Sequence, residues 1–183
     1  MVAGSTPSVE RLGVSAFTVP TETPEADGTL AWHETTLVLV RVLACGAIGM
    51  GYSFADIATA QVIDVHLKQA VVGGNCMNIS ELWSAMVHLI RNLGRPGICS
   101  MAISAVDNAL WDLKARLLRT SVADLLGRAH PSIAAYGSGG FTSYSDSQIE
   151  EAIVGMDRRG LDPGKDENRQ RSKFGCGARP VGS

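Results

Sequence analysis

The chain has 183 residues, which is enough for one good hydrophobic core or for one domain with part of a second. Its formal net charge of −2 gives no electrostatic argument for nucleic acid or an anionic membrane, so we expect neither as a partner. The four cysteines form no C-x-x-C pair, and neither a signal peptide nor a membrane-spanning run is recognisable, so we expect a reduced, cytoplasmic protein.

The first third of the chain predicts a small β-sheet. Val9–Val19 alternates loosely and is expected to be a first strand, whereas Pro20–Leu30 is polar and rich in turn-forming residues and is expected to be a mobile loop. Thr35–Leu43 is dense in β-branched residues and predicts a buried strand. Cys45–Gly51 contains three glycines and turns the chain into a further strand, which is expected to end near residues 52–54.

Helical spacing follows these strands. Ala55–Val71 carries apolar residues on one side of a predicted helix, and Ser80 is expected to cap the next helix. Further along the chain, Ser121-x-x-Asp124 predicts a short capped turn of helix that Gly127 ends. Strands followed by helices indicate an α+β domain with separate layers.

The most informative stretch is Ala102–Leu118, AISAVDNALWDLKARLL. Its apolar residues recur at i, i+3, i+4 and i+7, which predicts a long helix with one buried face. The small residues Ala102, Ala105 and Ala109 would let another backbone approach that face closely. The string ALWDLK at 109–114 resembles the last long helix of the N-terminal capping domain in the enolase superfamily, mandelate racemase/muconate lactonizing enzyme subgroup.

The resemblance implies a fold in two parts. Residues 1–130 are expected to be an α+β capping domain, with a three-stranded antiparallel sheet followed by a helical bundle. Residues 131–160 are expected to be the first βα unit of an incomplete TIM barrel, since a complete barrel alone takes ~250 residues. In that unit, Ile133–Gly139 predicts a strand, and Ser145-x-x-Gln148 predicts a capping box that opens a helix.

A missing barrel would leave apolar surface without a partner. The helix faces of 110–117 and 149–156 are expected to pack on a barrel in the intact family. Apolar patches larger than a few hundred Å² typically cause association, so this chain is expected to form a homo-oligomer or to aggregate.

Residues 161–183 change in composition and predict a disordered tail, because they are rich in charge and glycine. The resemblance implies a second barrel strand here with a Lys-x-Lys motif, but 164–169 is GKDENR. These residues can be encoded as GGT AAA GAT GAA AAT CGG, and reading one base later, completed by a C, gives VKMKIG. We therefore expect a frame-shifted tail. The alternative is a genuine short protein with a disordered tail.

The candidate site residues come from the resemblance. In the resembled family, loops that match 20–30 and 49–54 fold over the barrel mouth and shape substrate choice, so Tyr52 and Phe54 are candidates for substrate-facing side chains. The GSGG loop at 137–140 would lie at the carboxyl end of the first barrel strand and adds Ser138. The alternative for the two aromatic residues is burial in the hairpin's own core.

Other potentially reactive side chains are interpreted as structural. Asp107 and Asp112 are five positions apart on one helix and do not converge, so we expect them to make caps or ion pairs. The histidines lack zinc-binding spacing, and Cys45, Cys76 and Cys99 are expected to be small buried hydrophobic residues. No catalytic residue and no metal ligand is assigned to this chain.

The resemblance implies an intact enzyme that holds a small carboxylate substrate with Mg²⁺, removes its α-proton and acts as a racemase or acid-sugar dehydratase. The first hypothesis is that this chain is an N-terminal fragment of such an enzyme, without turnover or cofactor of its own. The second is a stand-alone α+β binding or oligomerisation module. The third is an enzyme of other chemistry.

Overall fold

The computed structural model describes residues 7–133 and 140–158. The described chain forms two compact units. The first contains residues 7–22 and 33–129, and the second contains 23–32, 130–133 and 140–158.

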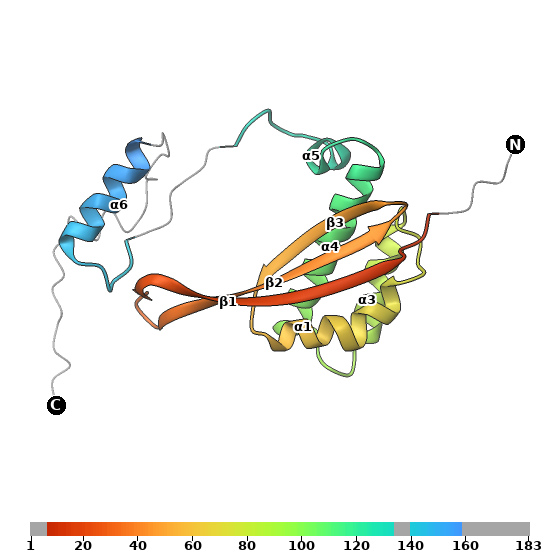
Figure 1. Ribbon diagram of the computed structural model, residues 1–183, viewed down its shortest axis with the longest axis horizontal. Coiled ribbons are helices and arrows are strands. Elements are labelled where there is room, and N and C mark those ends of the chain that lie inside the picture. Colours follow the sequence, from red (N-terminus) through yellow and green to blue (C-terminus); the bar gives the residue numbers. More distant parts are fainter. Residues whose placement is uncertain (1–6, 134–139, 159–183) are drawn as a thin grey trace, which may run out of the picture. The chain divides into compact units, whose positions relative to one another are not determined.

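The strands are β1 (Arg11–Ala26), β2 (Ala31–Ala44) and β3 (Ala47–Phe54), and they form one antiparallel sheet in the order β1-β2-β3 (Figure 1). A tight turn joins β2 to β3 at Cys45 and Gly46, which both have positive φ. Two consecutive positive φ angles are typical of the turns that close two-residue hairpins. The expected three-stranded sheet is therefore confirmed.

The prediction of a mobile loop at 20–30 was wrong. β1 continues through most of it to Ala26, and only the turn between Asp27 and Leu30 is left as loop. The prolines in this stretch favoured a loop, but β1 is an edge strand, where a missing backbone N–H is tolerated. The prolines and turn-forming residues therefore predicted the turn of the long β1–β2 hairpin in the wrong place.

The helical segments in the first unit follow the expected order. They are α1 (Ala58–Val62), a π-helical turn η1 (Ile63–Leu67), α2 (Lys68–Val71), α3 (Ile79–Leu89), α4 (Ile98–Leu117) and α5 (Val122–Leu126). The predicted Ser80 cap was wrong. α3 begins at Ile79, and Asn78 before it donates a side-chain hydrogen bond to the Glu81 carboxylate, 2.6 Å away.

The core lies between one face of the sheet and the helices. The inward residues Val38, Val40 and Val42 of β2 are fully buried, as are apolar residues of η1, α2, α3 and α4: Ile63, Leu67, Val71, Met86, Ile90, Leu110 and Leu113. Figure 1 shows α1, α3 and α4 on the same side of the sheet. Among the described residues of this unit, no helix lies on the other face of the sheet.

α4 packs directly on β3 because glycine stands where the two elements meet. A Cβ at Gly49 would overlap the carbonyl oxygen of Ala109, and a Cβ at Gly51 would overlap that of Ala105. The close approach expected from the small residues of this helix is thus confirmed. The face that contains Leu110 and Leu113 is already buried here, so the expectation that it needs a barrel was wrong.

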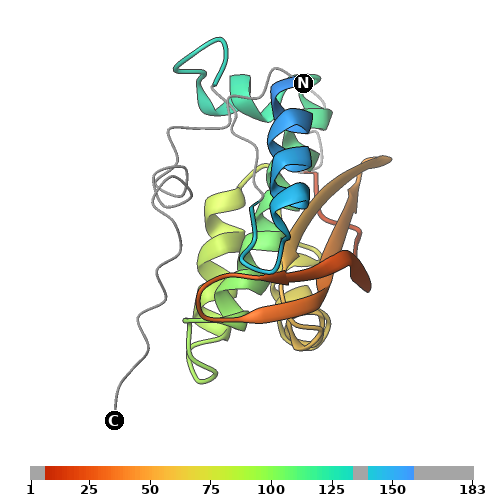
Figure 2. The ribbon, with the colours of Figure 1, turned by 90° about the vertical axis from the view of Figure 1, so that its left-hand side faces the viewer.

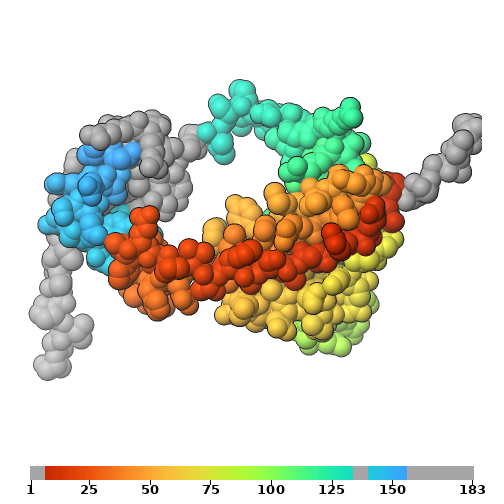
Figure 3. Space-filling view, viewed as in Figure 1, coloured from red at the N-terminus to blue at the C-terminus, as the bar shows by residue number. Residues whose placement is uncertain are grey.

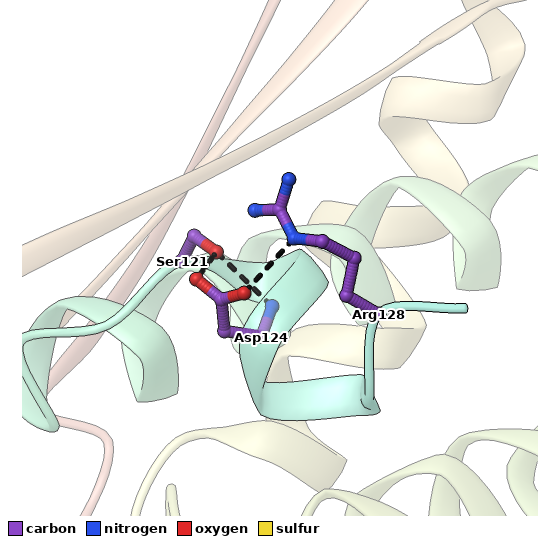
Figure 4. A network of polar contacts seen from close by, with 3 residues as sticks. All are labelled: Ser121, Asp124 and Arg128. Carbon is purple, nitrogen blue, oxygen red and sulfur yellow. Dashed lines mark hydrogen bonds and ion pairs between the residues drawn. The ribbon is translucent and has the colours of Figure 1, made fainter. Parts of the chain in front are cut away.

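The predicted cap of α5 is present (Figure 4). The Ser121 hydroxyl accepts a hydrogen bond from the Asp124 backbone N–H at 3.0 Å and donates one to its carboxylate at 2.7 Å. Arg128 Nε donates to the other oxygen of that carboxylate, 3.0 Å away. Gly127 follows the helix with a φ of 88°, as a terminating glycine does.

In the second unit, the predicted capping box opens α6 (Asp146–Arg158). The Ser145 backbone N–H donates to the Gln148 side-chain oxygen at 2.9 Å, and the Gln148 N–H donates back to the Ser145 hydroxyl at 3.4 Å. Ile133, the first residue of the expected barrel strand, is 92% exposed and not in a strand. The rest of that strand and the tail at 161–183 lie outside the described residues. No described helix is long and apolar enough to span a bilayer.

Candidate functional site

The outer face of β3 carries the two aromatic candidates. Because Gly49 and Gly51 face α4, the alternate residues of β3 point away from the helices. Tyr52 is 57% exposed and Phe54 is 62% exposed, and their rings meet edge to face with centroids 5.8 Å apart. The structure places both outside the core.

Further apolar side chains extend this outer face. Tyr52 pairs across the strands with Leu39, and Phe54 pairs with Leu37. The exposed apolar residues of β1 and β3, which together we call the outer sheet patch, are Phe17, Val19, Ile48, Met50, Tyr52 and Phe54. The space-filling view shows β1, β2 and β3 at the surface on this side (Figure 3).

A second aromatic group forms at the tip of the β1–β2 hairpin. The ring of Phe141 meets Trp32 edge to face at 5.5 Å and Tyr144 at 5.3 Å. The indole N–H of Trp32 also donates to the Glu25 carboxylate at 2.7 Å. Sequence reasoning missed this group, although Trp32 and Phe141 each border a polar turn, which is an unusual place for a large aromatic residue.

The hairpin tip lies beside the segment before α6 (Figure 2), and hydrogen bonds join the two. The backbone N–H of Thr142 donates to the carbonyl of Ala26 at 2.8 Å, and its hydroxyl lies 3.0 Å from the carbonyls of both Ala26 and Asp27. The Ser143 hydroxyl donates to the carbonyl of Pro24 at 2.7 Å. This clamp holds residues 141–144, just after the GSGG loop, against the hairpin tip.

The turn at the tip is shaped by one carboxylate. Asp27 accepts hydrogen bonds from the backbone N–H of Thr29 at 2.6 Å, from the Thr29 hydroxyl at 2.8 Å and from the N–H of Leu30 at 2.8 Å. These donors, led by the Thr29 N–H, lower the pKa of Asp27 because they favour the charged form. Asp27 is therefore used locally to hold the turn.

The two helical aspartates do not converge. Asp112 accepts hydrogen bonds from the Met50 backbone N–H and from Arg116 Nε, both at 2.8 Å, so it ties α4 to the edge of β3. Asp107 lies on another side of α4, half-buried, and burial raises its pKa. The ion pair expected for this helix is thus present at Asp112.

The remaining sequence candidates give no reactive centre. Ser138 lies outside the described residues. Cys76 and Cys99 are buried as expected, but Cys45 is exposed, because it occupies the β2–β3 turn. Within the residues that the structure describes, no three His, Cys, Asp or Glu side chains are grouped to hold a metal ion.

Known proteins resemble the chain over most of its length. Residues 12–127 match the family described as mandelate racemase/muconate lactonizing enzyme, N-terminal domain. A 3,6-anhydro-alpha-L-galactonate cycloisomerase of Streptomyces coelicolor is 33% identical over 137 residues, which are 72% of this chain and 38% of that protein.

Solved structures agree. A mandelate racemase/muconate lactonizing enzyme-like protein from Rubrobacter xylanophilus superposes with a TM-score of 0.83 at 42% identity, over 91% of this chain and 48% of that one. An L-talarate/galactarate dehydratase from Salmonella typhimurium, liganded with Mg and L-lyxarohydroxamate, superposes with a TM-score of 0.75 at 27% identity, over 86% of this chain and 43% of that one.

This chain thus spans less than half the length of the relatives it matches. The sheet, the helices and the matched residues agree on one assignment. The chain belongs to the mandelate racemase/muconate lactonizing enzyme family, whose N-terminal domain it contains.

Proposed function

We propose that this chain is the capping part of an enzyme that removes the α-proton of a small carboxylate with the help of Mg²⁺, as a racemase or an acid-sugar dehydratase. The observation that carries the proposal is the clamp between the hairpin tip and residues 141–144. It ties the capping hairpin to the segment that follows the first expected barrel strand, where active sites of such barrels are built.

The chain's own part in that reaction is to shape the entrance to the site. Tyr52 and Phe54 are proposed to face the substrate, and their exposed, mutually packed rings support this. Ser138 is proposed to lie in the loop at the end of the first barrel strand. No step through Mg²⁺ is assigned to the described residues, because no three metal-ligating side chains are grouped among them.

We further propose that residues 1–130 are the capping domain, that 131–160 are the first βα unit, and that 161–183 are read in a shifted frame. The support for the last part is the compatibility of residues 164–169 with VKMKIG in the other frame. The nucleotide sequence after codon 163 tests it. Continuous barrel sequence in the other frame is expected, and an early stop in every frame would contradict the proposal.

Activity is tested by deuterium wash-in at the α-carbon across a panel of sugar acids. The 183-residue chain is expected to give no exchange, whereas a chain with the frame restored is expected to exchange in the presence of Mg²⁺. In the restored enzyme, Tyr52→Ala and Phe54→Ala should change KM or substrate preference. Equal exchange by the unrepaired chain would overturn the fragment proposal.

A stand-alone binding or oligomerisation module is the second candidate function. The observation that favours it is the outer sheet patch, which is large, apolar and exposed. Two results together would favour this function over the first. They are the formation of a discrete oligomer by this chain and a nucleotide sequence with an early stop codon in every frame after codon 163. The small carboxylate substrate belongs to the first proposal only.

A further inference from the structure

A concave site lies between α3 and α4, and the proposed function does not use it. Its volume is about 290 Å³, and its lining residues are Ile79, Ser80, Trp83, Ser84, Asp107 and Trp111. α4 contacts β3 through Ala105 and Ala109, so Asp107 and Trp111 face another side of that helix. The site therefore belongs wholly to the first unit.

Two indole rings border this site, and each carries a cation over one face. Arg95 Cζ lies 5.0 Å from the centre of the Trp83 ring, and Lys114 Nζ lies 5.3 Å from that of Trp111. Lys114 is itself fixed, because it donates to the Met77 carbonyl at 2.9 Å. Cation–π contacts of this kind hold both rings in place as preformed apolar walls.

The site also contains polar groups that can bond to a ligand. Asp107 is half-buried, and its carboxylate accepts a side-chain hydrogen bond from Trp111, but none of the described ion pairs includes it. The hydroxyls of Ser80 and Ser84 make no hydrogen bond within the described part of the chain. A half-buried carboxylate that has lost part of its hydration gains from hydrogen-bond donors on a ligand.

We propose that this site binds a small, neutral, polyhydroxylated ring of pyranose size. The C–H face of such a ring would pack on the indoles, while its hydroxyls would donate to Asp107 and bond to the two serines. The volume is at the lower end of the range for ligand sites, which suits one ring and excludes a long chain of rings. Asp107 disfavours an anion, and Arg95 and Lys114 disfavour an organic cation.

The test is an NMR titration of the 183-residue chain that follows the indole N–H signals of its three tryptophans. Methyl α-D-glucopyranoside, methyl α-D-galactopyranoside and myo-inositol are the probes, with tetramethylammonium chloride and sodium gluconate as charged comparisons. We expect at least one neutral probe to shift the Trp83 and Trp111 signals saturably, with a Kd in the millimolar range. The Trp32 signal should stay unchanged, because this residue lies at the hairpin tip.

Two variants locate the site. Asp107→Asn keeps the shape but weakens the acceptor and should raise the Kd at least fivefold, whereas Trp83→Phe removes part of one wall and should do the same. Asp146→Asn on α6 is the matched control and should leave the Kd unchanged. Circular dichroism shows whether each variant is folded.

Three outcomes would overturn the proposal. The first is the absence of any saturable shift up to 100 mM of all three neutral probes. The second is an equal Kd for the wild type and Asp107→Asn. The third is saturation by tetramethylammonium or gluconate in place of the neutral rings. None of these measurements depends on α-proton exchange, so failure here leaves the proposed function untouched.

Discussion

Gly49 and Gly51 set the distance between β3 and α4. Any side chain at either position would meet backbone atoms of α4, which cannot rotate away as a side chain could. The alanines opposite them complete this contact. At the residue scale, the missing side chains on both elements therefore define the packing of the longest helix.

Gly51→Ala is expected to lower the free energy of unfolding by about 1–3 kcal/mol, since overpacking forces the backbone to shift. Urea unfolding followed by circular dichroism measures this change. Gly13→Ala is the matched control, because a Cβ at that position of β1 meets no atom within 4 Å. Equal stability of the two variants would show that α4 does not press on β3 as described.

Asp124 and Asp107 should give opposite dependences of stability on pH. The pKa of Asp124 is lowered in the fold, chiefly by the Ser121 hydroxyl and then by Arg128, so its stabilising effect is present above the ordinary pKa of 3.8 and is lost as the pH falls below it. The pKa of Asp107 is raised by burial, so its contribution favours the fold at low pH and is lost as the pH rises through the raised pKa.

Urea unfolding at about pH 3 and pH 7 separates the two effects. Asp124→Asn should destabilise the protein at pH 7 and have less effect at pH 3. Asp107→Asn should remove a penalty at pH 7, so the variant should be as stable as the wild type or more stable there. A loss of stability in Asp107→Asn at pH 7 would contradict this account of its burial.

At the scale of elements, sequence patterns predicted the features that depend on residues close together in the chain. The caps of α5 and α6 and the long helix were predicted, because a serine followed three residues later by an acceptor, or a period of 3.6, depends on neighbouring residues. The extension of β1 to Ala26 was not predicted, because its polar residues and prolines form a strand only when β2 pairs with them.

The candidate site was less predictable for the same reason. The resemblance proposed Tyr52 and Phe54, and strand alternation explains why they face outward once glycines face α4. The contact of Trp32 with Phe141 joins residues far apart in the chain, so no local pattern indicates it. Ser138 stays a prediction, because it lies outside the described residues.

Removal of the Thr142 hydroxyl is expected to weaken the clamp at the hairpin tip. Thr142→Val keeps the side-chain shape but removes the hydrogen bonds to the carbonyls of Ala26 and Asp27. Amide hydrogen exchange in 23–32 and 141–144 is expected to become several-fold faster, since local opening costs less free energy. Thr35→Val on an exposed position of β2 is the control, and an equal acceleration in both variants would exclude a specific role for Thr142.

At the scale of the whole molecule, we expect association to occur through the outer sheet patch. Its six side chains are each about half exposed, and side chains of this size bury ~150–250 Å² each when aromatic, so the patch offers on the order of 600 Å². That area approaches the ~800 Å² per partner of a standard protein interface. The expected cause of association is therefore this face of the sheet, and not the α4 face, which is buried.

Met50→Lys should shift the chain toward monomer in sedimentation velocity at tens of micromolar protein, because it places a charge in the patch. Val154→Lys on α6 is the matched control, since Val154 is 47% exposed and Met50 is 49% exposed. A wild type that is monomeric at that concentration, or a control that dissociates as far as Met50→Lys, would contradict this role of the patch.

The bond between Asp112 and the Met50 N–H has a consequence for the kind of assembly that this protein can form. β3 is an edge strand, and an open edge is a template onto which a foreign strand can add. The Asp112 carboxylate already accepts the hydrogen bond of the Met50 N–H on that edge, and its negative charge repels the carbonyl groups of an incoming strand. At the β3 edge, growth by strand addition, the route to cross-β fibrils, is thereby hindered. Contacts between sheet faces remain open to the protein, and such contacts reverse on dilution.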